Sequence, residues 1–354
     1  MDMLREILEL LTSAGLVALV AVPVGLLALF LSRRFAFPLL PAWRHRWCQW
    51  RVIDVLLLFG MYVMLPTLAG DLLERVGVYR AVFGDDPLLD PTSVGAIVGG
   101  SGTSLAEAWK YDRIARRTTL AGTVAMPFFA LGFFVLRRLG NAERATSSRR
   151  IPTDIAVGVG VWLAVTPLTF LVHFLANLIA KEYGYEPDAH PLKFAKLQTP
   201  LQICLLFLGA CVVAPFYEEM IFRRALLPWA SGRVARSWGL MAVAVLVAWV
   251  RMNDRSLFPA PLAFVLIATI LLAIVANLRR IWPRFLIRPA CAIVSTATLF
   301  AAMHSAVWPT PIPLFVLGLG LGWLVSRTRT VTAAVVVHGL FNAISALSLL
   351  RSAP

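Results

Sequence analysis

The sequence is poor in charged residues, and this absence excludes most classes of soluble protein. Only 15% of the 354 residues are Asp, Glu, Lys or Arg, whereas 59% are hydrophobic. Soluble domains usually carry about 25% charged and 45–50% apolar residues. The apolar residues gather in blocks of roughly 20, a length that lets a helix cross the hydrocarbon core of a bilayer. We therefore predict an integral, multi-pass membrane protein.

Cysteine is also scarce, which leaves little basis for a disulfide framework or a cysteine-ligated metal. The four cysteines are Cys48, Cys204, Cys211 and Cys291; none belongs to a CxxC pair, and three lie in apolar blocks. They are typical of small membrane-core residues. The Gly-rich stretch 95–102 is not followed by GKS or GKT, so it is predicted to be a turn and not a phosphate loop.

The net charge of +14 comes mostly from arginine. The arginines lie in short loops beside the apolar blocks, as the positive-inside rule expects. No basic stripe with interleaved aromatic residues appears, so nucleic acid is not expected as a partner. With ten spans the Arg-rich loops fall on one side, which we predict to be cytoplasmic. The Arg-rich and Ala-rich composition favours a bacterial cytoplasmic membrane.

The expected fold class is all-α, a polytopic transmembrane helical bundle of about ten spans. The first block follows an acidic segment and is predicted to be a retained helix, not a signal peptide. Residues 1–150 are expected to form an N-terminal membrane region of three spans with polar loops, and 151–354 a more continuous helical domain. The expected spans are 14–31, 53–71, 119–136, 154–179, 200–227, 238–251, 259–278, 288–306, 311–326 and 331–350.

The fifth expected span carries three ionisable residues, which are costly inside a bilayer and usually functional there. Glu218, Glu219 and Arg223 follow Pro215. Arg223 lies four residues after Glu219, so the two are expected to share a face and neutralise each other. Glu218 points about 100° away and is left to react. Pro215 is expected to kink the helix. The alternative is a charge cluster at a helix end.

Two later spans each carry a histidine with a partner four residues away, on the same face. Phe300 and His304 end the eighth expected span, and His338 and Asn342 lie in the tenth. Singly, each pair is consistent with a structural role, such as an interhelical hydrogen bond. The chain has only five histidines, and two follow the glutamates in this order. His173, in the fourth span, is predicted to be structural.

The combination suits hydrolysis of a peptide bond. A glutamate can act as general base on a water molecule that a histidine orients. A second histidine and an asparagine can donate hydrogen bonds to the oxyanion. Alternatively, Glu218, His304 and His338 can hold Zn²⁺ with one position open for water. The residues alone leave both mechanisms open.

In the order EExxxR, FxxxH and HxxxN, the chain resembles the CAAX protease and bacteriocin-processing (CPBP) family, also called the Abi or lysostaphin-resistance-protein-A-like family. The resemblance covers about residues 200–345. It implies a multi-helix membrane endopeptidase, whose eukaryotic relatives cleave the last three residues from prenylated CAAX proteins. It further implies structural support from Glu219 and Arg223.

The resemblance also implies the remaining roles. Glu218 and His304 would activate the water, while His338 and Asn342 would form the oxyanion site. The expected partners are the bilayer and a membrane-bound protein or peptide substrate, either lipidated or anchored by its C-terminus.

Two features depart from the family's usual pattern. The gap between Arg223 and Phe300 has room for two extra spans, so 238–278 is predicted to be an insertion, and residues 1–150 exceed the minimal core.

Two other functions are alternatives to a protease. A transporter or an ion or proton channel predicts inverted repeats, which the sequence does not show. A non-catalytic immunity or binding protein would keep the same fold.

Overall fold

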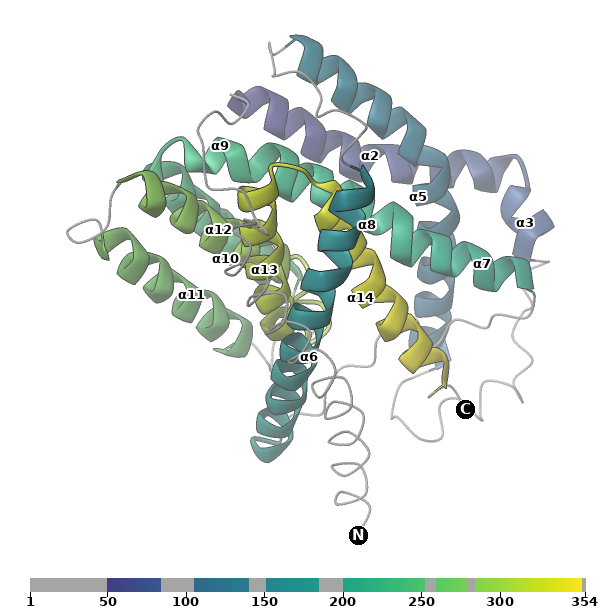
Figure 1. Cartoon of the computed structure of the whole chain (residues 1–354). Helices are drawn as coiled ribbons and strands as arrows, with labels where there is room; N and C mark the ends of the chain where they lie inside the picture. Colours follow the sequence, from purple (N-terminus) through teal and green to yellow (C-terminus); the bar gives the residue numbers. More distant parts are fainter. Residues whose placement is uncertain are drawn as a thin grey trace. The chain divides into compact units, whose positions relative to one another are not determined.

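The computed structural model describes residues 50–83, 105–139, 151–184, 200–251, 259–278 and 284–351. These residues form helices joined by turns, and no strand occurs among them (Figure 1). The all-α class is therefore confirmed. The expected first span, 14–31, and the Gly-rich stretch 95–102 lie outside the described residues.

The chain divides into two compact units, each assembled from several stretches and described here by itself. Unit 1 comprises residues 1–50, 143–188 and 222–337, and unit 2 comprises 51–142, 189–221 and 338–354. Two of the boundaries between the units fall inside helical runs, after Ile221 and after Val337. The expected division at residue 150, with its insertion, stays a prediction.

Unit 2 is built on a pair of long helices. Its α2 (Val52–Arg75) packs along α5 (Leu105–Leu139), and the short α3 (Val78–Phe83) follows α2. The first turn of α2 is closed by Arg51, whose backbone N–H donates to Asp54 and whose guanidinium lies 3.1 Å from the same carboxylate. The hydrogen bond from the guanidinium to Asp54, and then the charge of that carboxylate, raise the pKa of Arg51.

The rest of unit 2 comes from the glutamate-bearing run and from α14. The run begins with α7 (Pro200–Leu208), the π-helical turn η3 (Gly209–Val213) and α8 (Ala214–Glu219). Helix α14 (Thr332–Arg351) enters unit 2 at His338. Both α7 and η3 pack against α5.

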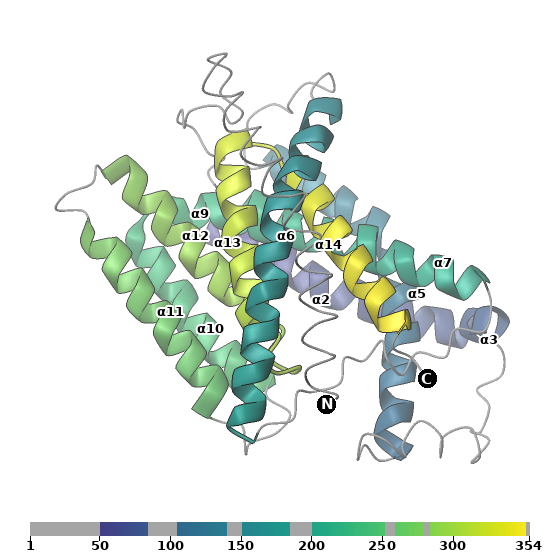
Figure 2. The ribbon, with the colours of Figure 1, turned by 60° about the horizontal axis from the view of Figure 1, so that its bottom comes forward.

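Unit 1 contains the remaining helices. Helix α12 packs against α9, α10, α11 and α13, and α13 packs against α6 (Figure 2). Buried residues of α10, α11 and α12, among them Met241, Leu272 and Cys291, form a shared apolar core. The bounds are α6 Ile151–Glu182, α9 Leu227–Ser231, α10 Val234–Arg251, α11 Pro259–Asn277, α12 Arg284–Ala302 and α13 Pro311–Thr328.

Two glycines explain how α13 approaches α12 so closely. A Cβ atom at Gly318 would lie 3.1 Å from the Cβ of Ala297, and one at Gly322 would lie 3.1 Å from Ile293. Small residues let helix backbones approach closely inside membranes. The GxxxG pattern therefore serves packing within the chain.

The expected spans agree with the described helices. Among the described residues, six helices are long and apolar enough to cross a membrane, and three shorter apolar helices overlap the expected spans 259–278, 288–306 and 331–350. The fifth span runs from Ile203 to Ser231. It extends beyond the expected end at residue 227, so Glu218 lies near its middle and not towards its end.

Candidate active site

The glutamate-bearing run is not a uniform α-helix. The π-helical turn η3 interrupts it before Pro215, and the second π-helical segment, η4 (Met220–Leu226), follows Glu219 directly. π-Helical turns inside α-helices are rare and frequently occur at functional sites. Both glutamates therefore lie in the short α-helical stretch between two irregular turns.

Tyr217 anchors this stretch inside unit 2. Its hydroxyl donates a hydrogen bond to the carbonyl of Gly122, at 3.2 Å, and its ring lies 4.7 Å from that of Phe129. Both partners belong to α5. The position and rotation of the next two residues, Glu218 and Glu219, are fixed by these contacts.

The two glutamates and His338 form a buried cluster in unit 2. His338 Nδ1 lies 3.0 Å from Glu219 Oε1, and the Glu219 side chain is 0% exposed. On the other side of the ring, Nε2 lies 3.7 Å from Glu218 Oε2, whose side chain is 13% exposed. The histidine ring thus lies between two carboxylates in different surroundings.

The hydrogen-bonding chemistry of this cluster distinguishes the two carboxylates. An ionised Glu219 only accepts, so His338 Nδ1 donates to it, and Nε2 is the ring nitrogen that faces Glu218. The separation of 3.7 Å is too long for a direct hydrogen bond. Glu218 is thus the carboxylate left available for a small molecule such as water.

Asn342 lies one turn after His338 and contacts the same helical run. Its amide nitrogen donates to the carbonyl oxygen of Ala210, in η3, at 2.8 Å. This bond was not expected from the sequence, which predicted an oxyanion donor at Asn342.

Arg223, Phe300 and His304 form a second group, in unit 1. Arg223 is buried, and its guanidinium lies 4.6 Å above the ring centre of Phe300. The edge of Phe222 meets the same ring at 5.4 Å. A guanidinium over an aromatic face is held by a cation–π attraction. Phe300 therefore provides the surface on which Arg223 rests.

His304 lies just beyond the end of α12, in a turn, and not within the helix as expected. Its Nδ1 lies 2.9 Å from the carbonyl oxygen of Phe300, and its ring centre lies 5.1 Å from the Phe300 ring. A carbonyl oxygen only accepts, so Nδ1 carries the hydrogen and Nε2 of the neutral ring keeps its lone pair. A nitrogen in this state can accept a proton.

The structure thus brings Glu218, Glu219, His338 and Asn342 together in unit 2 and places the remaining motif residues in unit 1. No group of three His, Cys, Asp or Glu side chains suited to a metal ion occurs among the described residues. Of the expected zinc ligands, Glu218 and His338 lie in unit 2 and His304 lies in unit 1, so zinc binding stays a prediction.

Two contacts at the site were not predicted from the sequence. In unit 1 the guanidinium of Arg251, at the end of α10, donates to the carbonyl of Met303 beside His304, at 3.1 Å. The indole of Trp50 donates to the carbonyl of Arg224 in η4, at 2.9 Å. Arg251 was the easier to find, because it is a charged residue at the end of an apolar helix.

His173, expected to be structural, contacts Asn177 one turn later in α6.

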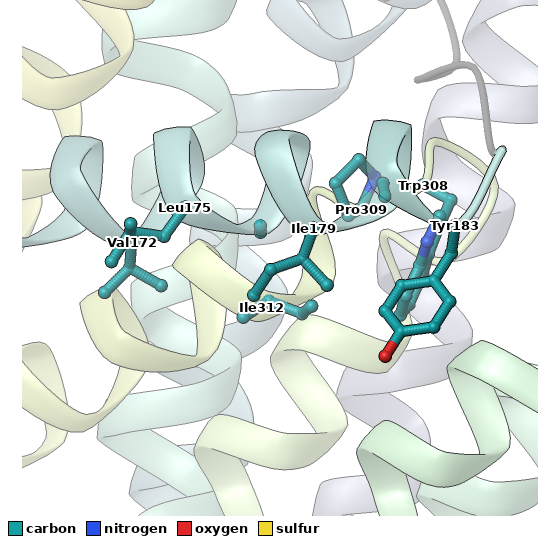
Figure 3. A pocket seen from close by; sticks show the side chains of 9 residues that line it. Val172, Leu175, Ile179, Tyr183, Trp308, Pro309 and Ile312 are labelled. Carbon is teal, nitrogen blue, oxygen red and sulfur yellow. The ribbon is translucent and has the colours of Figure 1, made fainter.

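An apolar pocket of about 340 Å³ lies in unit 1 between α6 and the segment 308–312. Figure 3 shows Ile179 of α6, Tyr183 directly after that helix, and Trp308 and Ile312 among the lining side chains. No predicted site residue lines it. The Tyr183 hydroxyl is one of few polar groups near it, so the pocket suits an apolar chain and not catalysis.

A comparison with protein families identifies the region that contains all three motifs. The family model described as "Type II CAAX prenyl endopeptidase Rce1-like" matches residues 200–290 and 278–344. The match confirms the resemblance inferred from the motifs and supports a protease in general. The first matched segment, 200–290, includes residues 238–278, which were predicted to be an insertion. No curated protein and no solved structure matches the chain.

Proposed function

We propose, from the Rce1-like match of residues 200–344 and from the cluster around His338, that the chain is an intramembrane endopeptidase. It would hydrolyse peptide bonds of membrane-associated substrates, with Glu218 activating the water. The observation that carries the proposal is the contrast between the two carboxylates. Glu219 is fully buried against His338, whereas Glu218 is partly exposed and not held by a direct hydrogen bond.

The surroundings make Glu218 the better general base. A base needs an accessible oxygen within hydrogen-bonding reach of the proton that it removes. The Glu218 side chain is 13% exposed and lies near the middle of an apolar span, where bulk water is scarce. Glu219 is committed to His338 Nδ1 and is more suited to fixing the orientation of the ring.

The proposed reaction conserves atoms and protons. The water oxygen attacks the carbonyl carbon of the scissile bond, and Glu218 takes one proton from the water. The carbonyl oxygen becomes an oxyanion, which an N–H at Nε2 of a protonated His338 would stabilise. The C–N bond then breaks, and the leaving amine takes the proton from Glu218. The products are a new carboxylic acid, which keeps the second proton of the water, and a new amine.

His304 keeps the water-orienting role that the family resemblance gives it, as a prediction. Its tautomer supports this role, because the bond from Nδ1 to the Phe300 carbonyl leaves Nε2 able to accept a proton. Arg223, buried against Phe300, is proposed as structural support.

The proposed substrates are membrane proteins or peptides that are lipidated or carry a C-terminal hydrophobic anchor. The position of Glu218 near the middle of a span supports a substrate that enters the bilayer. The membrane in question is proposed to be a bacterial cytoplasmic membrane.

The test compares protein termini in membranes from cells that express the wild type or Glu218→Gln. The variant keeps the size of the side chain and removes the base. Glu182→Gln, at the exposed end of α6, is the matched control. Uncleaved substrates should accumulate in Glu218→Gln alone. Identical termini in all three strains, at equal expression and folding, would sink the protease proposal.

A further inference from the structure

The carbonyl of Ala210 has lost its ordinary helical partner. In an α-helix it would accept from the N–H of Ala214, but that N–H donates to Gly209, one residue earlier, as the π-turn requires. The next donor in the π-helical register would be residue 215. That residue is proline, which has no N–H. The π-turn and Pro215 together release one carbonyl oxygen inside an apolar span.

Asn342 supplies the missing donor. Its side-chain nitrogen lies 2.8 Å from the Ala210 oxygen. An unsatisfied carbonyl in a bilayer costs several kcal/mol. This bond therefore favours the one position of α14 along η3 in which Asn342 reaches Ala210. The donor and the released carbonyl belong to different helices, so neither helix can slide along the other without breaking the bond.

Gly339 marks a second contact between the same two segments. A Cβ atom added there would overlap the carbonyl oxygen of Cys211, the residue after Ala210. The α14 backbone therefore lies directly against η3, and only glycine fits. Gly339 follows His338 immediately, and Asn342 lies one turn further along the helix. The two contacts thus fix the segment of α14 that carries the histidine.

We infer that Asn342 is a positioning residue, whose bond to the carbonyl released by Pro215 holds His338 in register with Glu218 and Glu219. This inference rests on the proposed function, and it gives Asn342 a role different from the oxyanion donor expected from the sequence. The register matters because His338 reaches both carboxylates, at 3.0 and 3.7 Å, from a separate helix.

The test is a double-mutant cycle between Asn342→Ala and Pro215→Ala. Alanine at 215 restores an N–H that can donate to Ala210, so the bond from Asn342 becomes dispensable. Asn342→Ala alone should lower the melting temperature in detergent by about 2–4 °C. It should also lower kcat about tenfold with little change in KM. Both effects should shrink by at least half when Pro215→Ala is present.

Two controls keep the result interpretable. Ser345→Ala removes a polar group on the same helix whose hydroxyl bonds to Phe341 and not to η3, so its effect should be additive with Pro215→Ala. Pro215→Ser restores the same N–H and replaces Pro215→Ala if the latter does not fold.

Each outcome decides the inference. Equal losses from Asn342→Ala with and without Pro215 would overturn it. Rescue of stability without rescue of kcat would also overturn it, because Asn342 would then act on the reacting atoms. If the wild type cleaves nothing, the proposed function fails, and the melting temperatures alone test the register bond between Asn342 and Ala210.

Discussion

Replacing Glu219 tests whether this buried carboxylate orients His338. Two variants separate the hydrogen bond from the charge. Glu219→Gln keeps an oxygen that accepts from His338 Nδ1, whereas Glu219→Leu removes the acceptor and leaves a buried N–H beside an apolar side chain. The bond is 3.0 Å long and fully buried, so the surrounding solvent cannot replace it.

The magnitudes follow from the type of hydrogen bond. A bond to a charged group contributes about 1.5–3 kcal/mol, and a neutral bond about 0.5–1.5 kcal/mol. Glu219→Gln should therefore cost about 1 kcal/mol, or about fivefold in kcat. Glu219→Leu should cost about 1.5–3 kcal/mol, roughly a tenfold to hundredfold loss, since each 1.4 kcal/mol corresponds to a factor of ten.

The assay is single-turnover cleavage by protein in proteoliposomes, with melting temperatures measured in parallel. Glu218→Gln is the reference for loss of the base and should be far less active than Glu219→Gln. Wild-type activity in Glu219→Leu would refute the orienting role. So would a Glu219→Gln variant as inactive as Glu218→Gln, because that result would make Glu219 the base.

Two further predictions concern packing around the motifs. Gly339→Ala should destabilise the protein by about 1–3 kcal/mol or more, because the added Cβ overlaps the backbone carbonyl of Cys211 and overpacking has about that cost. Gly60→Ala is the control, since a Cβ there would have nothing within 4 Å. It should leave the thermal unfolding temperature unchanged or higher. Arg223→Lys should lower stability by about 0.5–2 kcal/mol, since lysine lacks the planar group that stacks on Phe300; chemical denaturation should show this loss, and a lysine variant as stable as the wild type would contradict the stacking role.

Helix positions were largely predictable from the sequence because length and apolarity determine them. The short span 238–251 and the Gly-rich span 311–326 both correspond to helices of 18 residues that could cross a membrane. The fifth span was expected to end at residue 227, a few residues before its end in the structure. In the structure Arg223 is buried, and the helical run continues to Ser231.

The predicted site residues lie in both units, and their contacts depend on backbone geometry that cannot be read from the sequence. The expected pairing of Glu219 with Arg223 rests on α-helical spacing and stays a prediction. Residues from Met220 onwards are π-helical, where the hydrogen bonds connect residues five apart and the faces shift. His338 comes from a segment more than a hundred residues later, and its contact with Glu219 required the tertiary structure.

Pro215 illustrates the same limit. The expected consequence was a kink, which follows from the missing N–H. The structure contains a π-turn before the proline, and the released carbonyl of Ala210 accepts a hydrogen bond from Asn342. The proline predicted an irregularity, but its form depended on a partner from another helix.

The most direct test of the central claim uses purified protein in proteoliposomes with a library of membrane-anchored peptides in H₂¹⁸O. A water-activating glutamate at 218 predicts that the wild type produces new C-termini carrying a single ¹⁸O atom. Glu218→Gln should bind the same peptides and cleave none. Cleavage by Glu218→Gln at the wild-type rate, or a wild type that binds the peptides and never incorporates ¹⁸O, would contradict the account.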